Sequence, residues 1–141
     1  MMFPQIRCNY SDALKNENVF FILCKGNNAG KPSLQPWPNS FAIICQHNEY
    51  KEFYFWLVYA LHQAGKFKVR HRGSVIPFIN INDVRDLLRE IAPALHDDWS
   101  RLQQLTKTLD ALSSLKTSLL QQVQASERLQ KHLLYNFFAN V

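Results

Sequence analysis

Two short segments of the chain carry residue types that could bind a phosphate group. The first, KGNNAGKPSLQPWPNS at positions 25–40, combines two glycines with two lysines, as nucleotide-binding loops do. A nucleotide P-loop needs four residues between its glycines and a Ser or Thr after its lysine. Here only three residues separate Gly26 from Gly30, and Pro32 occupies the position of the hydroxyl. We therefore interpret the segment as a turn-rich connection with two exposed lysines, not as a nucleotide site.

The second segment, KFKVRHRG at positions 66–73, alternates cations with other residues. If it is extended, side chains two positions apart share a face, so its four lysines and arginines form one row. Two interpretations of that row stay open. Four like charges about 7 Å apart repel one another, which favours contact with a polyanion such as a nucleic-acid backbone. A charged edge strand that blocks unwanted strand pairing has the same pattern.

A nucleic-acid interface would use both segments. Lysines and arginines would contact phosphates, while asparagines in the glycine-rich loop, together with Asn39, would read base edges. The predicted nucleic-acid-binding residues are Lys25, Asn27, Asn28, Lys31, Lys66, Lys68, Arg70 and Arg72.

The remaining residues indicate no catalytic or metal centre. The chain has no H-E-x-x-H or G-x-S-x-G motif, no carboxylate pair in a recognisable setting and no methyltransferase signature. The spacings of its three cysteines, Cys8, Cys24 and Cys45, match no zinc or redox motif, and two of them lie inside apolar runs. We expect reduced thiols in a cytoplasmic protein that is not an enzyme and binds no cofactor.

The charge of the chain is distributed unevenly. The 141 residues carry a formal net charge of +5. Positions 1–75 hold nine Lys and Arg against four Asp and Glu, whereas positions 76–141 hold seven against seven. An excess confined to the first half favours an anionic partner for that half. The longest apolar run, Phe53–Leu61, is too short to cross a bilayer and the N-terminus resembles no secretory signal, so no membrane partner is expected.

The elements that must position the two basic segments follow from the hydrophobic pattern. Val19–Cys24 and Phe41–Cys45 are runs of β-branched and aromatic residues, and they predict buried strands on either side of the glycine-rich loop. From Glu49 to Gly65 apolar residues recur at steps of three and four, which predicts a helix with many aromatic side chains.

The segment after this helix is predicted to extend the sheet. Both KFKVRHR at 66–72 and GSVIPFININD at 73–83 have strand patterns. Asn82 or Asp83 then caps a short helix, which Pro93 interrupts. The predicted fold class is α+β, with a small mixed sheet, a packed aromatic helix and a long C-terminal helix.

The last third of the chain predicts that long helix. No glycine or proline follows Pro93, and apolar residues keep close to heptad spacing as far as position 138, with Lys116 breaking the seam. A continuous helix of this length measures about 60 Å. It either pairs with a second chain as a coiled coil or folds back as a hairpin near Ser113 or Ser126. The predicted oligomerisation residues are Leu102, Leu105, Leu109, Leu112, Leu119 and Val123.

The order of these elements resembles the DNA specificity subunit of type I restriction-modification systems. In that family a target-recognition domain, with a glycine-rich loop and a helix rich in tyrosine and leucine, precedes a helical spacer. The matching stretches are GNNAGK (26–31), EFYFWLVYAL (52–61), GSVIPFINI (73–81) and LDALSSLKTSLLQQV (109–123). The recognition domain is shorter than is usual in that family, which implies a short or degenerate half-subunit. KGNNAGKP and GSVIPFI also look like small uncharacterised proteins of gut Bacteroidetes, including ones carried on mobile elements.

The sequence is compatible with two functions. The leading one is a non-catalytic DNA-binding module, with a small α+β recognition-like domain at residues 1–95 and a helix at 96–141 that pairs two copies or docks another subunit. The alternative is a protein-interaction adaptor that uses the helix and binds no nucleic acid. Salt-sensitive DNA binding would favour the first, and concentration-dependent association without it would favour the second.

Overall fold

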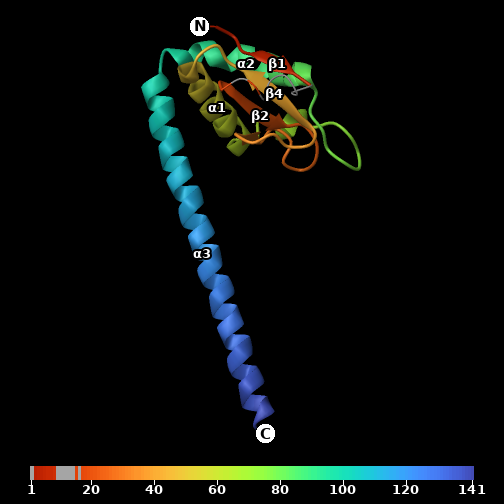
Figure 1. The fold of residues 1–141 in the computed structure, drawn as a ribbon, viewed down its shortest axis with the longest axis vertical. Coiled ribbons are helices and arrows are strands. Elements are labelled where there is room, and N and C mark those ends of the chain that lie inside the picture. The colour runs from red at the N-terminus through yellow and green to blue at the C-terminus, as the bar shows by residue number, and fades with distance from the viewer. Residues whose placement is uncertain (1, 9–14, 16) are drawn as a thin grey trace. The chain divides into compact units, whose positions relative to one another are not determined.

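The computed structural model describes residues 2–8, 15 and 17–141. The chain forms two compact units, Met1–Gln103 and Gln104–Val141. The first unit combines a small sheet with helices, and the second is helical (Figure 1). The predicted α+β class is confirmed.

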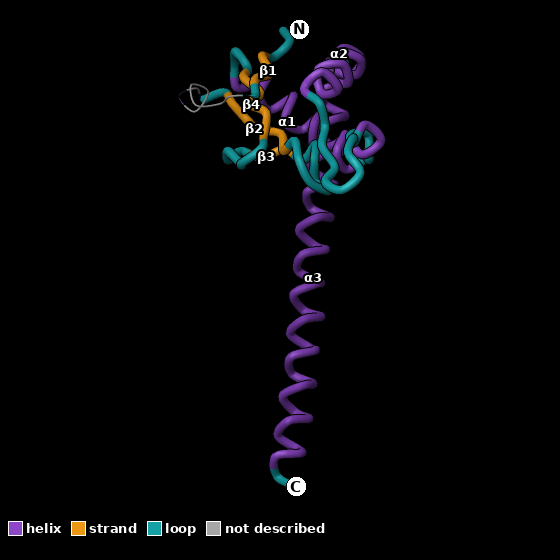
Figure 2. Tube along the Cα trace, turned by 90° about the vertical axis from the view of Figure 1, so that its right-hand side faces the viewer, coloured by secondary structure: helices purple, strands orange, loops and turns teal. Residues whose placement is uncertain are grey.

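The sheet of the first unit has four strands in the order β1-β4-β2-β3 (Figure 2). Every pairing is antiparallel, so the expectation of a mixed sheet is wrong. The connections between β2, β3 and β4 are loops without a helix, and parallel neighbours would need a long crossover. The strands are β1 (Gln5–Arg7), β2 (Val19–Leu23), β3 (Pro32–Ser33) and β4 (Ser40–Ile44).

The two central strands divide their side chains between two faces. Phe20 and Ile22 of β2 enter the main core together with Ile43 of β4, while Phe21 and Ala42 form a separate cluster on the opposite face. This is the period-two alternation of a strand. β2 and β4 are the strands predicted from the sequence, and their β-branched and aromatic residues explain why they form the centre of the sheet.

Two helices cover the main core on one face of the sheet (Figure 1). α1 spans Asn48–Gln63, which confirms the predicted aromatic helix. Its buried side chains, at three- and four-residue steps, are Phe53, Tyr54, Leu57, Val58 and Leu61.

α2 spans Ile81–His96 and differs from the prediction at both ends. The side chain of Asn80 caps it by accepting a hydrogen bond from the amide of Asn82 at 3.1 Å, so the cap predicted at positions 82 or 83 is wrong. The helix also continues past Pro93. Proline removes one backbone hydrogen bond, but buried Ala92 and Leu88 hold this last part of the helix against the core.

The segment 66–80 contains no strand, so both strand predictions there are wrong. Lys68–Arg70 form a short 3-10 helix, η2, and the following residues make only isolated bridges. Phe67 explains the difference, because its side chain is 1% exposed and the chain turns to bury it. Gly65 and Gly73 on either side have positive φ angles, which extended segments do not use.

α3 spans Trp99–Ala139 as one helix of 41 residues. The hairpin alternative is therefore wrong (Figure 2). Trp99 and Leu102, in its first turn, belong to the core of the first unit. Leu102 is 5% exposed, so it is a core residue and not the oligomerisation residue that the sequence indicated.

Candidate nucleic-acid interface

Three backbone segments, two of them consecutive in the chain, meet at one edge of the first unit and carry all the predicted cations. We call them the three-loop surface: loop 1 is 24–31, loop 2 is 64–72 and loop 3 is 73–80. Loops 1 and 3 are joined by hydrogen bonds from the amide of Gly26 to the carbonyl of Pro77, at 2.7 Å, and from Ile79 to Cys24, at 3.0 Å. Loops 2 and 3 are joined by a reciprocal pair between Arg72 and Phe78, at 2.8 and 2.9 Å.

Loop 2 is also fixed directly to loop 1. Gly30 has φ +100°, and a Cβ placed on it would lie 2.5 Å from Cβ and Cγ of Phe67. Only glycine allows both that backbone angle and that approach. The Nε2 atom of His71 lies 2.9 Å from the carbonyl oxygen of Ala29, a second link between the two loops. The turn interpretation of the glycine-rich loop is thereby confirmed, with Gly26 also at positive φ.

The four predicted lysines, Lys25, Lys31, Lys66 and Lys68, are all exposed on these loops. The Nζ atom of Lys31 lies 5.5 Å from the centre of the Trp37 ring, a distance at which the ring face attracts the cation. The four lysines lie on loops that fold against one another. Lys66, Lys68, Arg70 and Arg72 do not form the predicted single row of an extended strand, because Lys68–Arg70 form η2.

The two predicted arginines already have carboxylate partners. Arg72 donates from Nε and Nη2 to the two carboxylate oxygens of Asp83, both at 3.1 Å, in a bidentate pair. Nη2 of Arg70 lies 3.5 Å from Oε2 of Glu90. Both carboxylates come from α2. The arginines therefore contribute less positive field to the surface than the sequence indicated.

The predicted base-reading asparagines lie in two places. Asn27 and Asn28 are exposed on loop 1, beside the lysines. Asn39 lies before β4, with φ 56°, and its carbonyl oxygen accepts hydrogen bonds from the amide and the thiol of Cys24 at 2.8 Å. Its backbone therefore helps to hold the start of loop 1.

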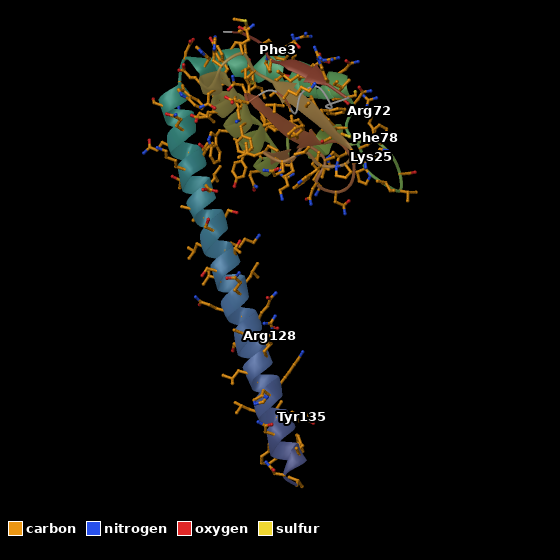
Figure 3. The ribbon with its side chains drawn as sticks, viewed as in Figure 1. Phe3, Lys25, Arg72, Phe78, Arg128 and Tyr135 are labelled. Carbon is orange, nitrogen blue, oxygen red and sulfur yellow. The ribbon has the colours of Figure 1, made fainter. Side chains whose placement is uncertain are left out.

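Apolar side chains interleave with the cations, and this feature was missed from the sequence. Val69, Val75 and Ile76 are exposed, and Phe78 is 39% exposed. Lys25, Ile76 and Phe78 line an open depression of about 380 Å³. Figure 3 shows Lys25, Arg72 and Phe78 close together at this edge. The apolar pattern of loop 3 was interpreted as a strand at an edge or a bulge, and no signal in a single sequence separates such a strand from an exposed apolar loop.

The electrostatic environment of the surface is positive. No Asp or Glu occurs at positions 18–48 or 53–82, which include all three loops. The Nδ1 atom of His62 is buried and has no hydrogen-bond partner among the described residues. Burial lowers the pKa of His62 below its ordinary value of 6.5, and the charges of Lys31 and His71 lower it further. A protonated His62 is disfavoured first because burial removes its hydration, and second because the charge of Lys31 repels it.

The described part of the chain shows neither a metal centre nor a membrane-spanning helix. Among positions 2–8, 15 and 17–141, no group of three or more His, Cys, Asp or Glu side chains is placed to hold a metal ion. Within the same part of the chain, no helix combines the length and the apolar character needed to cross a membrane.

The predicted oligomerisation residues beyond Leu102 lie on α3. Leu109 is partly buried, and the other four are between 51% and 56% exposed. Large apolar side chains continue this exposure to the end of the helix. The four exposed residues of the predicted oligomerisation set are Leu105, Leu112, Leu119 and Val123.

Comparisons with known proteins identify a family but not an activity. Residues 6–136 match the model of a family of unknown function, DUF6943. No curated protein and no solved structure matches the chain significantly.

Proposed function

Because the chain belongs to DUF6943, a family of unknown function, its role has to be inferred from its own residues, and we propose that the three-loop surface binds the phosphate backbone of DNA. The observation that carries the proposal is the convergence of Lys25, Lys31, Lys66 and Lys68 on loops that contain no carboxylate. Lysines are effective point charges for phosphate, and their flexible stems can follow an irregular backbone.

The apolar depression adds a second mode of contact. A nucleobase stacked on the ring of Phe78 would bring its phosphates close to Lys25, which lines the same depression. Stacking of this kind requires an unpaired base, so the proposal favours single-stranded or locally opened DNA over an intact duplex. Asn27 and Asn28 on loop 1 would supply the polar contacts to base edges.

The resemblance to type I specificity subunits supports the same non-catalytic role in DNA binding. Such subunits recognise DNA without cleaving it, and the glycine-rich loop of the resemblance is loop 1. The bidentate Arg72–Asp83 pair has a defined place in this proposal. It holds loop 2 against α2 and leaves phosphate contact to the four lysines.

Binding of labelled single-stranded and duplex DNA across a salt series tests the proposal. Four phosphate contacts on a duplex should give a slope of about −4 for log affinity against log salt. Phe78→Leu should weaken the binding of single-stranded DNA by about tenfold and the binding of duplex DNA much less. The reason is that only an unpaired base would lose its stacking surface. A slope near zero would contradict the proposal.

A second candidate function is favoured by α3. Its exposed apolar residues are unusual for an isolated helix, and they suit a protein-interaction adaptor that associates through this helix. On this proposal Leu112→Lys abolishes concentration-dependent association, and the lysines of the three-loop surface serve only solubility.

A further inference from the structure

The second unit carries an apolar face that runs along α3. At 100° per residue, eleven large apolar side chains of α3 fall within a stripe about 140° wide, whereas Leu129 and Tyr135 lie outside it. Lys107, Gln121 and Asn136 lie on the side opposite the stripe. The side chains of this face are exposed or partly buried. The residues of the apolar face are Leu105, Leu109, Leu112, Leu115, Leu119, Leu120, Val123, Leu133, Leu134, Phe137 and Phe138.

The centre of this face is a row with an eleven-residue repeat. Ten positions from 105 to 138 follow one another at steps of three and four, and seven of them are apolar. A repeat of 11 residues over three turns is close to the helix period, so the row stays on one side of α3. The row consists of Leu105, Leu109, Leu112, Lys116, Leu120, Val123, Glu127, Lys131, Leu134 and Phe138.

The steps of the row are the same in both directions. They run 4-3-4-4-3-4-4-3-4, with the midpoint between Gln121 and Gln122. A second helix that is reversed about this midpoint therefore places a row position opposite every row position. The symmetry also pairs the charged exceptions, because Lys116 and Glu127 lie at equal distances from the midpoint.

We propose that α3 pairs with α3 of a second copy of this chain, antiparallel, about a two-fold axis between Gln121 and Gln122. In this register Leu105 lies opposite Phe138 and Leu109 opposite Leu134. Leu120 lies opposite Val123 at the centre. Apolar layers thus occupy both ends and the middle of the pair.

The polar positions fit the same register. Lys116 lies opposite Glu127 of the second copy, so the pair contains two such ion pairs, one on each side of the axis. Lys131 lies opposite Leu112, where its aliphatic stem can cover the leucine while the ammonium stays in water. A parallel pair in register would instead place Lys116 against Lys116 and Glu127 against Glu127. Charge complementarity therefore selects the antiparallel orientation.

The length of the face is sufficient for a specific interface. Residues 105–138 overlap over about 50 Å in this register. A standard interface removes about 1,600 Å² from solvent, or about 80 Å² for each of the twenty row positions of the two copies. Half-exposed leucine and phenylalanine side chains can supply areas of this size. The inference gives the adaptor function a partner, a second copy, and is independent of DNA binding.

The first test is a charge exchange measured by sedimentation equilibrium on the full chain. Lys116→Glu and Glu127→Lys should each weaken the dimer about tenfold, because each places like charges together twice. The double variant should return to within about threefold of the original affinity. Helix content from circular dichroism checks that each variant folds. Asp110→Lys, outside the row, is the matched control and should leave the affinity unchanged.

The second test reads the orientation directly from distances between spin labels. Cysteines replace Lys107, Gln121 or Asn136 one at a time, in a chain whose Cys8 and Cys24 are serine. The antiparallel register predicts about 50 Å between the two labels at 107, the same at 136, and about 25 Å at 121, where both labels point away from the interface.

Each alternative to the antiparallel pair gives a different result. Short distances between the two labels at all three positions would overturn the antiparallel register, although the chain would still associate with a second copy. A monomer at every concentration would overturn the proposal entirely, and the apolar face would then contact the first unit or a different protein. DNA binding enters neither measurement, so failure here leaves the three-loop proposal standing.

Discussion

At position 30 the backbone leaves room for a hydrogen atom and nothing larger. Gly30→Ala should destabilise the first unit by about 2–4 kcal/mol, because the new methyl group meets Phe67 and the residue keeps a positive φ. Gly26→Ala is the matched control, since Gly26 shares the positive φ but has no atom within 4 Å of the added Cβ. It should cost only about 1 kcal/mol. Urea denaturation measures both, and equal losses would mean that the Phe67 contact is unimportant.

The pKa of His62 is sensitive to the positive charge of the three-loop surface. Its pKa is lowered by burial and then by Lys31 and His71. The unfolded chain therefore binds the proton first, and the free energy of unfolding should fall as pH drops below about 6.5. In NMR titration, Lys31→Gln should raise the pKa of His62, whereas Lys107→Gln should leave it unchanged. A His62 that titrates at its ordinary value in the unmodified chain would contradict this description of the field.

The elements of the fold differ in how well local sequence determines them. β2, β4 and α1 were predictable because each has a clear period of hydrophobic residues and each packs with that period against one core. Segment 66–80 was not, because its structure depends on a distant contact. Phe67 is buried against Gly30, 37 positions earlier, and neither residue reveals that pairing locally.

The start of α2 gives a prediction at the scale of elements. Asp83 lies in its first turn and pairs with Arg72 of loop 2. Asp83→Asn should lower stability by about 1 kcal/mol, because it removes a favourable charge at the helix N-terminus and an ion pair whose arginine is largely exposed.

The same change should strengthen DNA binding, since Arg72 becomes available to phosphate and the salt slope grows by about one. Asp86→Asn makes the same change of charge on an exposed residue of α2. If the two variants increased affinity equally, net charge alone would explain the effect and Arg72 would have no part in the interface.

At the scale of the whole chain, the sequence predicted the candidate residues better than their arrangement. The lysines follow from composition, and the continuity of α3 follows from the absence of glycine and proline after Pro93. The convergence of the loops, the neutralisation of Arg70 and Arg72, and the apolar depression depend on contacts between segments far apart in sequence.

The measurement that tests the central claim most directly is fluorescence anisotropy of labelled DNA across a salt series with two variants of equal charge. In one, Lys25, Lys31, Lys66 and Lys68 become serine; in the other, the exposed cations Arg7, Arg101, Lys107 and Arg128 become serine.

Each variant lowers the net charge from +5 to +1 by removing four cations. The account predicts that the three-loop variant loses at least about tenfold in affinity and most of its salt dependence, while the control keeps a slope of about −3 on single-stranded DNA and about −4 on a duplex. Equal losses in both variants, or no binding by the unmodified chain at low salt, would contradict it.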